Sequence, residues 1–154
     1  MSQRPLLHVT VVTAQQTVFD GSAEMVIAPG GDGQLGILPR HAPLLTTLAQ
    51  GELRVRQHGV DESIFVAGGF LEVNSNVVTI LADDAERATE VDEARAQEAR
   101  DRARALLARG GLSTEVEAET TAELNRAVGR LRIAELQRQR RGTRPRPPQP
   151  EQEI

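Results

Sequence analysis

The glycines at positions 31, 33 and 36 have the spacing most suggestive of chemistry in this sequence. Together they spell G-x-G-x-x-G, the pattern with which dinucleotide-binding proteins hold a pyrophosphate. In those proteins the glycines open a helix whose N-terminus meets the pyrophosphate. Here Pro39 and Pro43 follow without a helical pattern. We therefore expect tight β-turns in this segment and no nucleotide fingerprint.

The other chemistry-bearing residues do not form a catalytic set. His8, His41 and His58 lie on separate segments, without the spacing expected of zinc ligands. No nucleophile-elbow motif accompanies the serines. All 18 basic residues are arginines, which excludes a phosphate-loop lysine and Schiff-base chemistry. Because cysteine is absent too, the sequence predicts no catalytic residue and no metal site.

Composition narrows the class of protein further. The chain of 154 residues has room for one domain of ordinary size, or for a small domain with an appendage. Only 2% of the residues are aromatic, too few for a platform that stacks nucleic-acid bases, and the net charge of −4 disfavours nucleic-acid binding through neutralisation of backbone phosphates. No apolar run approaches the roughly 20 residues that cross a bilayer. We expect a soluble protein that does not bind nucleic acid.

Segments of alternating polarity make up the first half of the chain. Leu7, Val9 and Val11 alternate with other residues, and Leu53 and Val55 alternate with arginines, a period of two typical of half-buried strands. Turn-forming glycine, asparagine and proline residues separate these segments. Because no helical stretch lies between them, the sequence predicts an all-β sandwich or barrel.

Beyond Asp83 the apolar residues recur at helical spacing. The stripe of a first helix consists of Ala85, Ala88, Val91, Ala99, Ala103 and Leu106. The stripe of a second helix consists of Leu124, Ala127, Leu131 and Ala134. Gly110 and Gly111 are expected to end the first helix, and Ser113 or Thr114 to cap the second.

The predicted fold class is therefore α+β, with three parts. An all-β sandwich at residues 1–83 precedes an antiparallel two-helix hairpin at 84–141, and a proline-rich disordered tail follows at 142–154. The hairpin is expected to dock weakly, since each carbon missing where alanine replaces leucine forfeits about 0.8 kcal/mol. Gly129, inside the second helix, costs about 1 kcal/mol more in helix propensity.

Charge is sorted along the second helix. Four acids and no base lie between residues 111 and 123, whereas eight arginines and one acid lie between residues 125 and 146. Two interpretations stay open. In the first, the order of charges stabilises the helix through its dipole. In the second, the arginines form a basic arm that binds an acidic protein surface.

The segment from Ala28 to Leu45, APGGDGQLGILPRHAPLL, resembles the signature segment of the epsilon subunit of bacterial F-type ATP synthase. Two later runs, VAGGFLEV at 66–73 and VVTILA at 77–82, resemble the final strands of the same family. The resemblance implies a β-sandwich of about ten strands followed by a two-helix domain. It also implies a non-catalytic central-stalk subunit, clamped to the γ subunit and seated on the ring of c subunits.

In this family the glycine-rich turn region contacts the polar loops of the c-ring. The resemblance carries the contact with the c-ring or γ onto Gln34 and His41. Gln34 stands where some members carry an acid, which weakens the case for a salt bridge there. For His41 the alternative stays open that it only shapes a turn beside Pro39 and Pro43.

A second resemblance lies in the helices. The run VDEARA at 91–96 is similar to the family's ATP-binding motif, Ile/Leu-Asp-x-x-Arg-Ala, and supplies Asp92 and Arg95. The resemblance also places Glu86, Arg126 and Arg130 at nucleotide-binding positions. Arg126 and Arg130 are i, i+4 neighbours that can fork onto phosphate oxygens, and the Asp92 carboxylate can accept from an adenine amino group. The alternative is that Asp92 and Arg95 form only a surface ion pair.

The resemblance implies a subunit that couples γ to the c-ring during ion-driven ATP synthesis. It requires no cofactor, and it joins the cytoplasmic side of the cell membrane only through the complex. An extended hairpin would meet acidic surfaces of the alpha and beta catalytic subunits and inhibit ATP hydrolysis, whereas regulatory ATP would favour the folded hairpin. The alternative, from another class, is a stand-alone β-sandwich adaptor or ligand-binding module with a helical tail.

Overall fold

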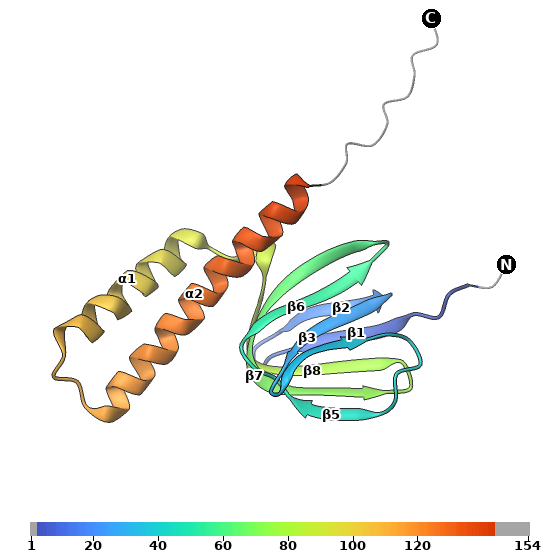
Figure 1. Ribbon diagram of the computed structural model, residues 1–154, viewed down its shortest axis with the longest axis horizontal. Coiled ribbons are helices and arrows are strands. Elements are labelled where there is room, and N and C mark those ends of the chain that lie inside the picture. The colour runs from blue at the N-terminus through green and yellow to red at the C-terminus, as the bar shows by residue number, and fades with distance from the viewer. Residues whose placement is uncertain (1–2, 144–154) are drawn as a thin grey trace, which may run out of the picture.

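The computed structural model describes residues 3–143 as a β-sandwich followed by two helices, as expected (Figure 1). The strands are β1 (Leu7–Val12), β2 (Thr17–Ala23), β3 (Met25–Gly30), β4 (Gly33–Ile37), β5 (Leu44–Thr47), β6 (Gly51–Gln57), β7 (Val60–Asn74) and β8 (Val77–Arg87). A 3-10 turn, η1 (Ala88–Glu90), leads into α1 (Glu93–Arg109) and α2 (Thr114–Gly142). None of the helices in residues 3–143 has the length and apolar character that crossing a bilayer requires.

The strands form one sheet that folds over on itself in the order β2-β1-β8-β7-β6-β3-β4, with β5 paired to β7. The first half of β7 pairs with β6 and its second half with β5, so this strand belongs to both layers. The bend lies at Gly68 and Gly69, whose φ angles are 65° and 106°. A side chain on Gly69 would collide with the carbonyl oxygen of Leu81, so glycine is required there. Since β7 and β8 each contribute to both layers, the eight strands are consistent with the count of about ten.

The main core fills the space between the two layers. The alternation predicted from sequence is confirmed, since Leu53 and Val55 are fully buried while Arg54 and Arg56 lie on the other face of β6. The glycine-rich segment forms the turn between β3 and β4, where Gly30 pairs with Gly33. That turn confirms the expectation of a tight β-turn in place of a nucleotide fingerprint.

The sandwich extends further along the chain than the sequence predicts. The boundary expected after residue 83 falls inside β8, which continues to Arg87 because Ala85 and Glu86 pair with Val66 and Phe65 of β7. Ala85 therefore belongs to the core of the sandwich, and Ala88 begins η1. The helical stripe starts only within α1, and Glu86 lies on a strand.

The helical hairpin itself follows the sequence closely. Gly110, with a φ of 69°, ends α1, and the Ser113 side chain caps α2 by accepting from the Val116 N–H. The buried residues of the seam include the alanines expected there, Ala103, Ala127 and Ala134. The helix α2 lies between α1 and the sandwich and contacts β6 and β7 (Figure 1). It ends at Gly142 as expected, but residues 144–154 of the predicted tail lie outside the described residues.

Candidate functional site

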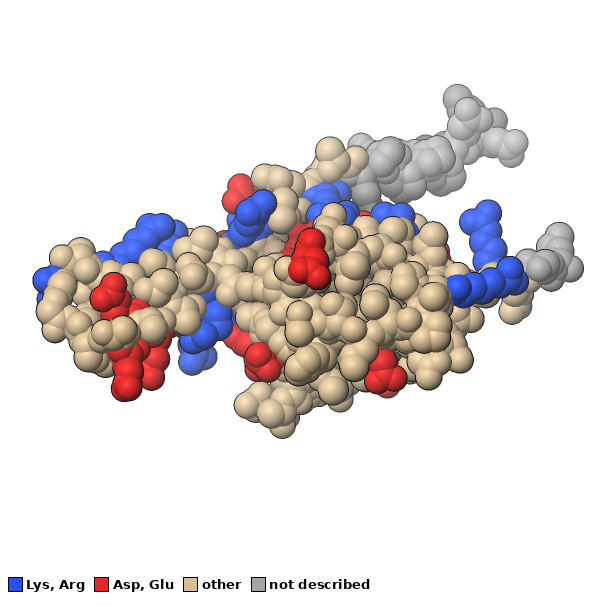
Figure 2. Space-filling view, turned by 60° about the horizontal axis from the view of Figure 1, so that its bottom comes forward, with Lys and Arg blue, Asp and Glu red and all other residues tan. Residues whose placement is uncertain are grey.

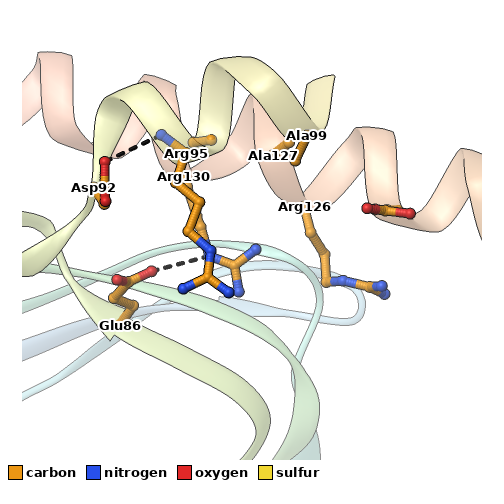
Figure 3. A pocket seen from close by; sticks show the side chains of 9 residues that line it. Glu86, Asp92, Arg95, Ala99, Arg126, Ala127 and Arg130 are labelled. Carbon is orange, nitrogen blue, oxygen red and sulfur yellow. Dashed lines mark hydrogen bonds and ion pairs between the residues drawn. The ribbon is translucent and has the colours of Figure 1, made fainter. Parts of the chain in front are cut away.

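A pocket of about 450 Å³ opens where α1, α2 and the end of β8 meet (Figure 3). All five residues assigned to nucleotide binding by resemblance line it. They are Glu86, Asp92, Arg95, Arg126 and Arg130. The remaining lining consists of Glu123 and three alanines, Ala96, Ala99 and Ala127. The structure therefore brings together side chains from the end of β8, the start of α1 and the middle of α2, which lie far apart in the sequence.

Asp92 is held by the start of α1. Its Oδ1 accepts a hydrogen bond from the Arg95 backbone N–H at 3.1 Å, so this carboxylate is the N-cap of the helix. The expected alternative, an ion pair between the Asp92 and Arg95 side chains, is not among the ion pairs of residues 3–143. The Arg95 guanidinium is thus available to the pocket. The neighbouring carboxylate of Glu93 pairs with Arg138 of α2, and this hydrogen bond lowers the pKa of Glu93.

Arg130 is tied to the sandwich. Its Nε lies 3.0 Å from Glu86 Oε2, its Nη2 pairs with Asp84, and its guanidinium stacks on the Phe65 ring, 4.9 Å from the centroid. The two carboxylates compensate its charge in this state. Sequence reasoning missed Asp84 and Phe65, because a strand-to-helix contact between residues 46 positions apart leaves no local pattern.

Arg126 is the more available of the two α2 arginines. Within the described part of the chain it has no ion-pair partner, although it lies one turn before Arg130 and projects from the same side of α2 (Figure 3). Beside it, Ala99 and Ala127 supply small apolar surface. Guanidinium groups next to such a surface suit a ligand with an anionic part and a flat apolar part. The lining holds three carboxylates and three arginines, so an anion must compete with Glu86 for Arg130.

The two residues assigned to c-ring or γ contact do not lie together. Gln34 is exposed on β4 and lines a groove with Gln50 and Asn125 of α2. His41 is half-buried in the loop after β4, and its Nδ1 lies 2.7 Å from the Ala42 carbonyl oxygen. This loop is fastened to the β7–β8 turn, where the Arg40 N–H donates to Asn76 Oδ1 at 2.6 Å.

An apolar patch on the sandwich was not found from the sequence. Leu45, Phe70 and Leu81 point outward from β5, β7 and β8, with 71%, 53% and 53% of their surface exposed, and Phe70 pairs with Leu81. We call these three residues the apolar patch. Figure 2 shows that much of the sandwich surface carries few charges, whereas arginines and acids gather on the helices. Consecutive apolar residues at 44–45 and 70–71 could have revealed the patch, since one of two neighbours on a strand must face outward.

The fold and the pocket together define a small two-domain chain in which a β-sandwich carries an exposed apolar patch and a helical hairpin forms a charged pocket with the end of β8. Comparison with known proteins narrows this class. The family model described as "ATP synthase, Delta/Epsilon chain, beta-sandwich domain" matches residues 6–88. The ATP synthase epsilon chain of Dehalococcoides mccartyi (strain BAV1) is 47% identical over 132 residues, which cover 86% of this chain and 94% of that one.

The epsilon chain of Herpetosiphon aurantiacus is also 47% identical, over 134 residues that cover 87% of this chain and 98% of that one. Among solved structures, a chain of the Euglena gracilis mitochondrial ATP synthase shares the fold, with a TM-score of 0.60 and 22% identity over 87% of this chain and 81% of that chain. This chain belongs to the family of ATP synthase epsilon chains, and it is a non-catalytic subunit of that complex. Family membership decides against the stand-alone adaptor.

Proposed function

We propose that this chain is the central-stalk subunit that couples γ to the c-ring of a rotary F-type ATP synthase, with a hairpin that inhibits ATP hydrolysis and responds to ATP. The epsilon-chain family supports the coupling role, and the Euglena chain that shares the fold was solved in an assembly that includes F1 and a c-ring. We place the subunit at the cytoplasmic side of the cell membrane, held there by the complex.

The apolar patch is the proposed contact with γ. Three large exposed side chains on neighbouring strands gain free energy when a partner covers them. The test is pull-down of γ by the full chain carrying Phe70→Glu. Val60→Glu is the matched control, because Val60 is also an exposed apolar residue but lies at the β6–β7 turn. Capture should fall for Phe70→Glu alone, and equal capture by both variants would contradict this assignment.

The c-ring contact is proposed for the exposed residues around Gln34 and His41. Because they lie in separate places, we propose two contacts, with the loop carrying His41 and the β4 position of Gln34 acting separately. Cross-linking from Gln34→Cys and His41→Cys in the assembled complex tests this, since the chain has no natural cysteine. Each position should yield a cross-link to the c-ring or to γ, and cross-links to neither would contradict the assignment.

The nucleotide response is proposed for the pocket between the helices and β8. Its support is the convergence of all five motif positions on one pocket. Arg126 and Arg95 would take the phosphates, Arg130 would join them by exchanging its carboxylate partners, and the alanines would lie against the base. Because such a ligand touches α1, α2 and β8 at once, it binds only the docked hairpin. At a hundredfold excess over Kd it stabilises that state by about 2.7 kcal/mol.

Equilibrium binding of ATP to the purified full chain, with and without Mg²⁺, tests the pocket. Arg126→Ala should weaken binding by about tenfold or more, since hydrogen bonds to charged groups contribute about 1.5–3 kcal/mol. Two variants separate the two roles of Asp92. Asp92→Asn keeps the helix cap and removes only the carboxylate charge, whereas Asp92→Ala removes both the cap and the charge. Binding that is unchanged in Arg126→Ala would refute the site.

Inhibition is proposed to come from the extended hairpin. Arginines exposed on α2, including Arg132, Arg138 and Arg141, would then face acidic surfaces of the alpha and beta subunits. The test is ATP hydrolysis by the assembled complex with the full chain, in comparison with Arg132→Gln. Faster hydrolysis by the variant at equal assembly is expected. Hydrolysis at the wild-type rate in this variant and in an Arg138→Gln, Arg141→Gln double variant would contradict the proposal.

A further inference from the structure

The last turns of α2 are fastened to the sandwich by a buried hydrogen bond that lies outside the nucleotide pocket. The pairing of β7 with β8 ends at Ile64 and Arg87. The preceding residue, Ser63, pairs with Arg54 of β6, but β8 places no residue opposite it. The Gln137 side chain takes this place, with its Oε1 accepting from the Ser63 N–H at 2.9 Å. Ser63 is fully buried, and Gln137 is 7% exposed.

Arg140, one turn later, adds a charged contact to β7 and to its other neighbour, β6. Its Nη1 donates to Ser63 Oγ at 2.6 Å and its Nη2 to Glu52 Oε1 at 2.6 Å. The Glu52 side chain is only 13% exposed, and Arg54 approaches the same oxygen at 3.3 Å. Without Arg140, this largely buried carboxylate would keep only Arg54 as an ion-pair partner among residues 3–143, which disfavours the docked arrangement.

We propose that Gln137 and Arg140 form a latch that positions α2 on the sandwich and so sets the fraction of molecules whose nucleotide pocket is assembled. Neither residue lines that pocket. Both act through α2, which carries Arg126 and Arg130. The inference rests on the proposed nucleotide response for its effect on ATP affinity, but the docking itself is a property of the chain alone.

The latch acts on one side of the docking equilibrium. In the undocked hairpin, water solvates the Ser63 N–H and the Glu52 carboxylate, so a missing partner costs nothing there. In the docked hairpin, loss of the Gln137 acceptor leaves a buried donor unpaired. Gln137→Met, which nearly keeps the side-chain volume, should therefore lower the docking equilibrium constant by roughly 5- to 140-fold. Gln137→Glu retains an acceptor and should dock better than Gln137→Met.

The experiment measures docking and ATP affinity separately in the full chain. Thr121→Cys on α2 and Glu72→Cys on β7 carry spin labels, and the distribution of distances between them gives the docked fraction. The variants are Gln137→Met, Gln137→Glu and Arg140→Met. Gln139→Met is the matched control, since Gln139 is exposed on the same helix and, within residues 3–143, its side chain hydrogen-bonds only to Glu135.

We expect the docked fraction to fall in Gln137→Met and Arg140→Met, to recover in Gln137→Glu, and to stay at the wild-type value in the control. Apparent Kd for ATP should rise as the docked fraction falls, so that their product stays constant across the variants. Unchanged label distances in Gln137→Met and Arg140→Met would overturn the latch. If the affinity for ATP falls while the docked fraction is unchanged, Gln137 and Arg140 do not act through docking, and that part of the proposal is wrong. If the wild-type chain fails to bind ATP, the nucleotide proposal fails, and the label distances still decide on the latch.

Discussion

Replacing Gly129 by alanine should move the hairpin away from the sandwich, although the same substitution favours helix formation. Glycine inside a helix costs about 1 kcal/mol relative to alanine. That gain applies to α2 in both the docked and the undocked hairpin, so it does not shift the balance between them. A Cβ at this position, however, would lie 2.7 Å from Phe65 Cε2 and 2.9 Å from Gln50 Nε2, and only in the docked state.

The magnitude follows from the lack of room. Phe65 is fully buried, so its ring cannot turn aside without disturbing its neighbours, and α2 must shift by about 0.7 Å to restore an ordinary contact distance of 3.4 Å. Overpacking of this kind costs about 1–3 kcal/mol. Since 1.4 kcal/mol is a factor of ten, Gly129→Ala should raise the undocked population about 5- to 140-fold.

Hydrogen exchange of the Ser63 amide reports the effect, because the N–H is bonded to Gln137 only when α2 is docked. Its exchange should accelerate in Gly129→Ala. Gly142→Ala is the matched control, since it adds a Cβ to the same helix with no atom of the described residues within 4 Å. Ser63 protection equal to or greater than that of the wild type in Gly129→Ala would refute the reasoning, because it would mean that the crossing of α2 over Phe65 tolerates a methyl group.

Two further outcomes follow from contacts within the sandwich. Asn76→Gly keeps a φ of 65° accessible but removes the acceptor of the Arg40 N–H, so Arg40 amide exchange should quicken by up to about tenfold, whereas Ser75→Gly in the same turn should leave it unchanged. The hydrogen bond from Arg56 lowers the pKa of Asp61 in the folded chain. This pair therefore stabilises the fold fully at pH values above the unfolded carboxyl pKa of about 3.9, and its contribution is lost as the pH falls through the lowered pKa of the folded chain. Arg56→Met should therefore flatten the acid side of the curve of unfolding free energy against pH, as urea titrations at pH 2–7 would show, and an unchanged slope there would contradict the assignment.

Local features of the fold could be predicted because short stretches of sequence determine them. Gly110 and Ser113 bound the helices through their own backbone and side-chain geometry, and the alternation around Leu53 needs only the period of a strand. The end of β8 could not be predicted in this way. Ala85 and Ala88 have helical spacing, but pairing with β7 keeps residues up to Arg87 extended, and that partner lies far away in the sequence.

The candidate site likewise has one part that the sequence predicts and another part that depends on contacts between distant segments. A motif resemblance supplied five residues that line one pocket, but it did not supply the contacts that those residues make. Asp84 and Phe65, which hold Arg130, and Ser63, which holds Gln137, belong to strands that come near α2 only in the folded chain. Gly129 shows the difference most clearly. In the sequence it is a penalty on helix stability, whereas in the structure it is the point where α2 approaches Phe65 closely.

The way the hairpin is attached to the sandwich is compatible with the movement proposed for it. The main core is built from sandwich residues alone, so its apolar packing does not include the hairpin. Where α2 meets the sandwich, the buried apolar cluster is small, with Ile133 against Phe65 and Ala88, and several other contacts are polar, such as those of Gln137 and Arg130. Water can replace polar contacts when the hairpin leaves, so each contributes only about 0.5–1.5 kcal/mol net, or about 1.5–3 kcal/mol where a charged group takes part. A docking free energy assembled from such terms is comparable to what a bound ligand can supply, and this is the condition under which a ligand concentration can govern the position of a helix.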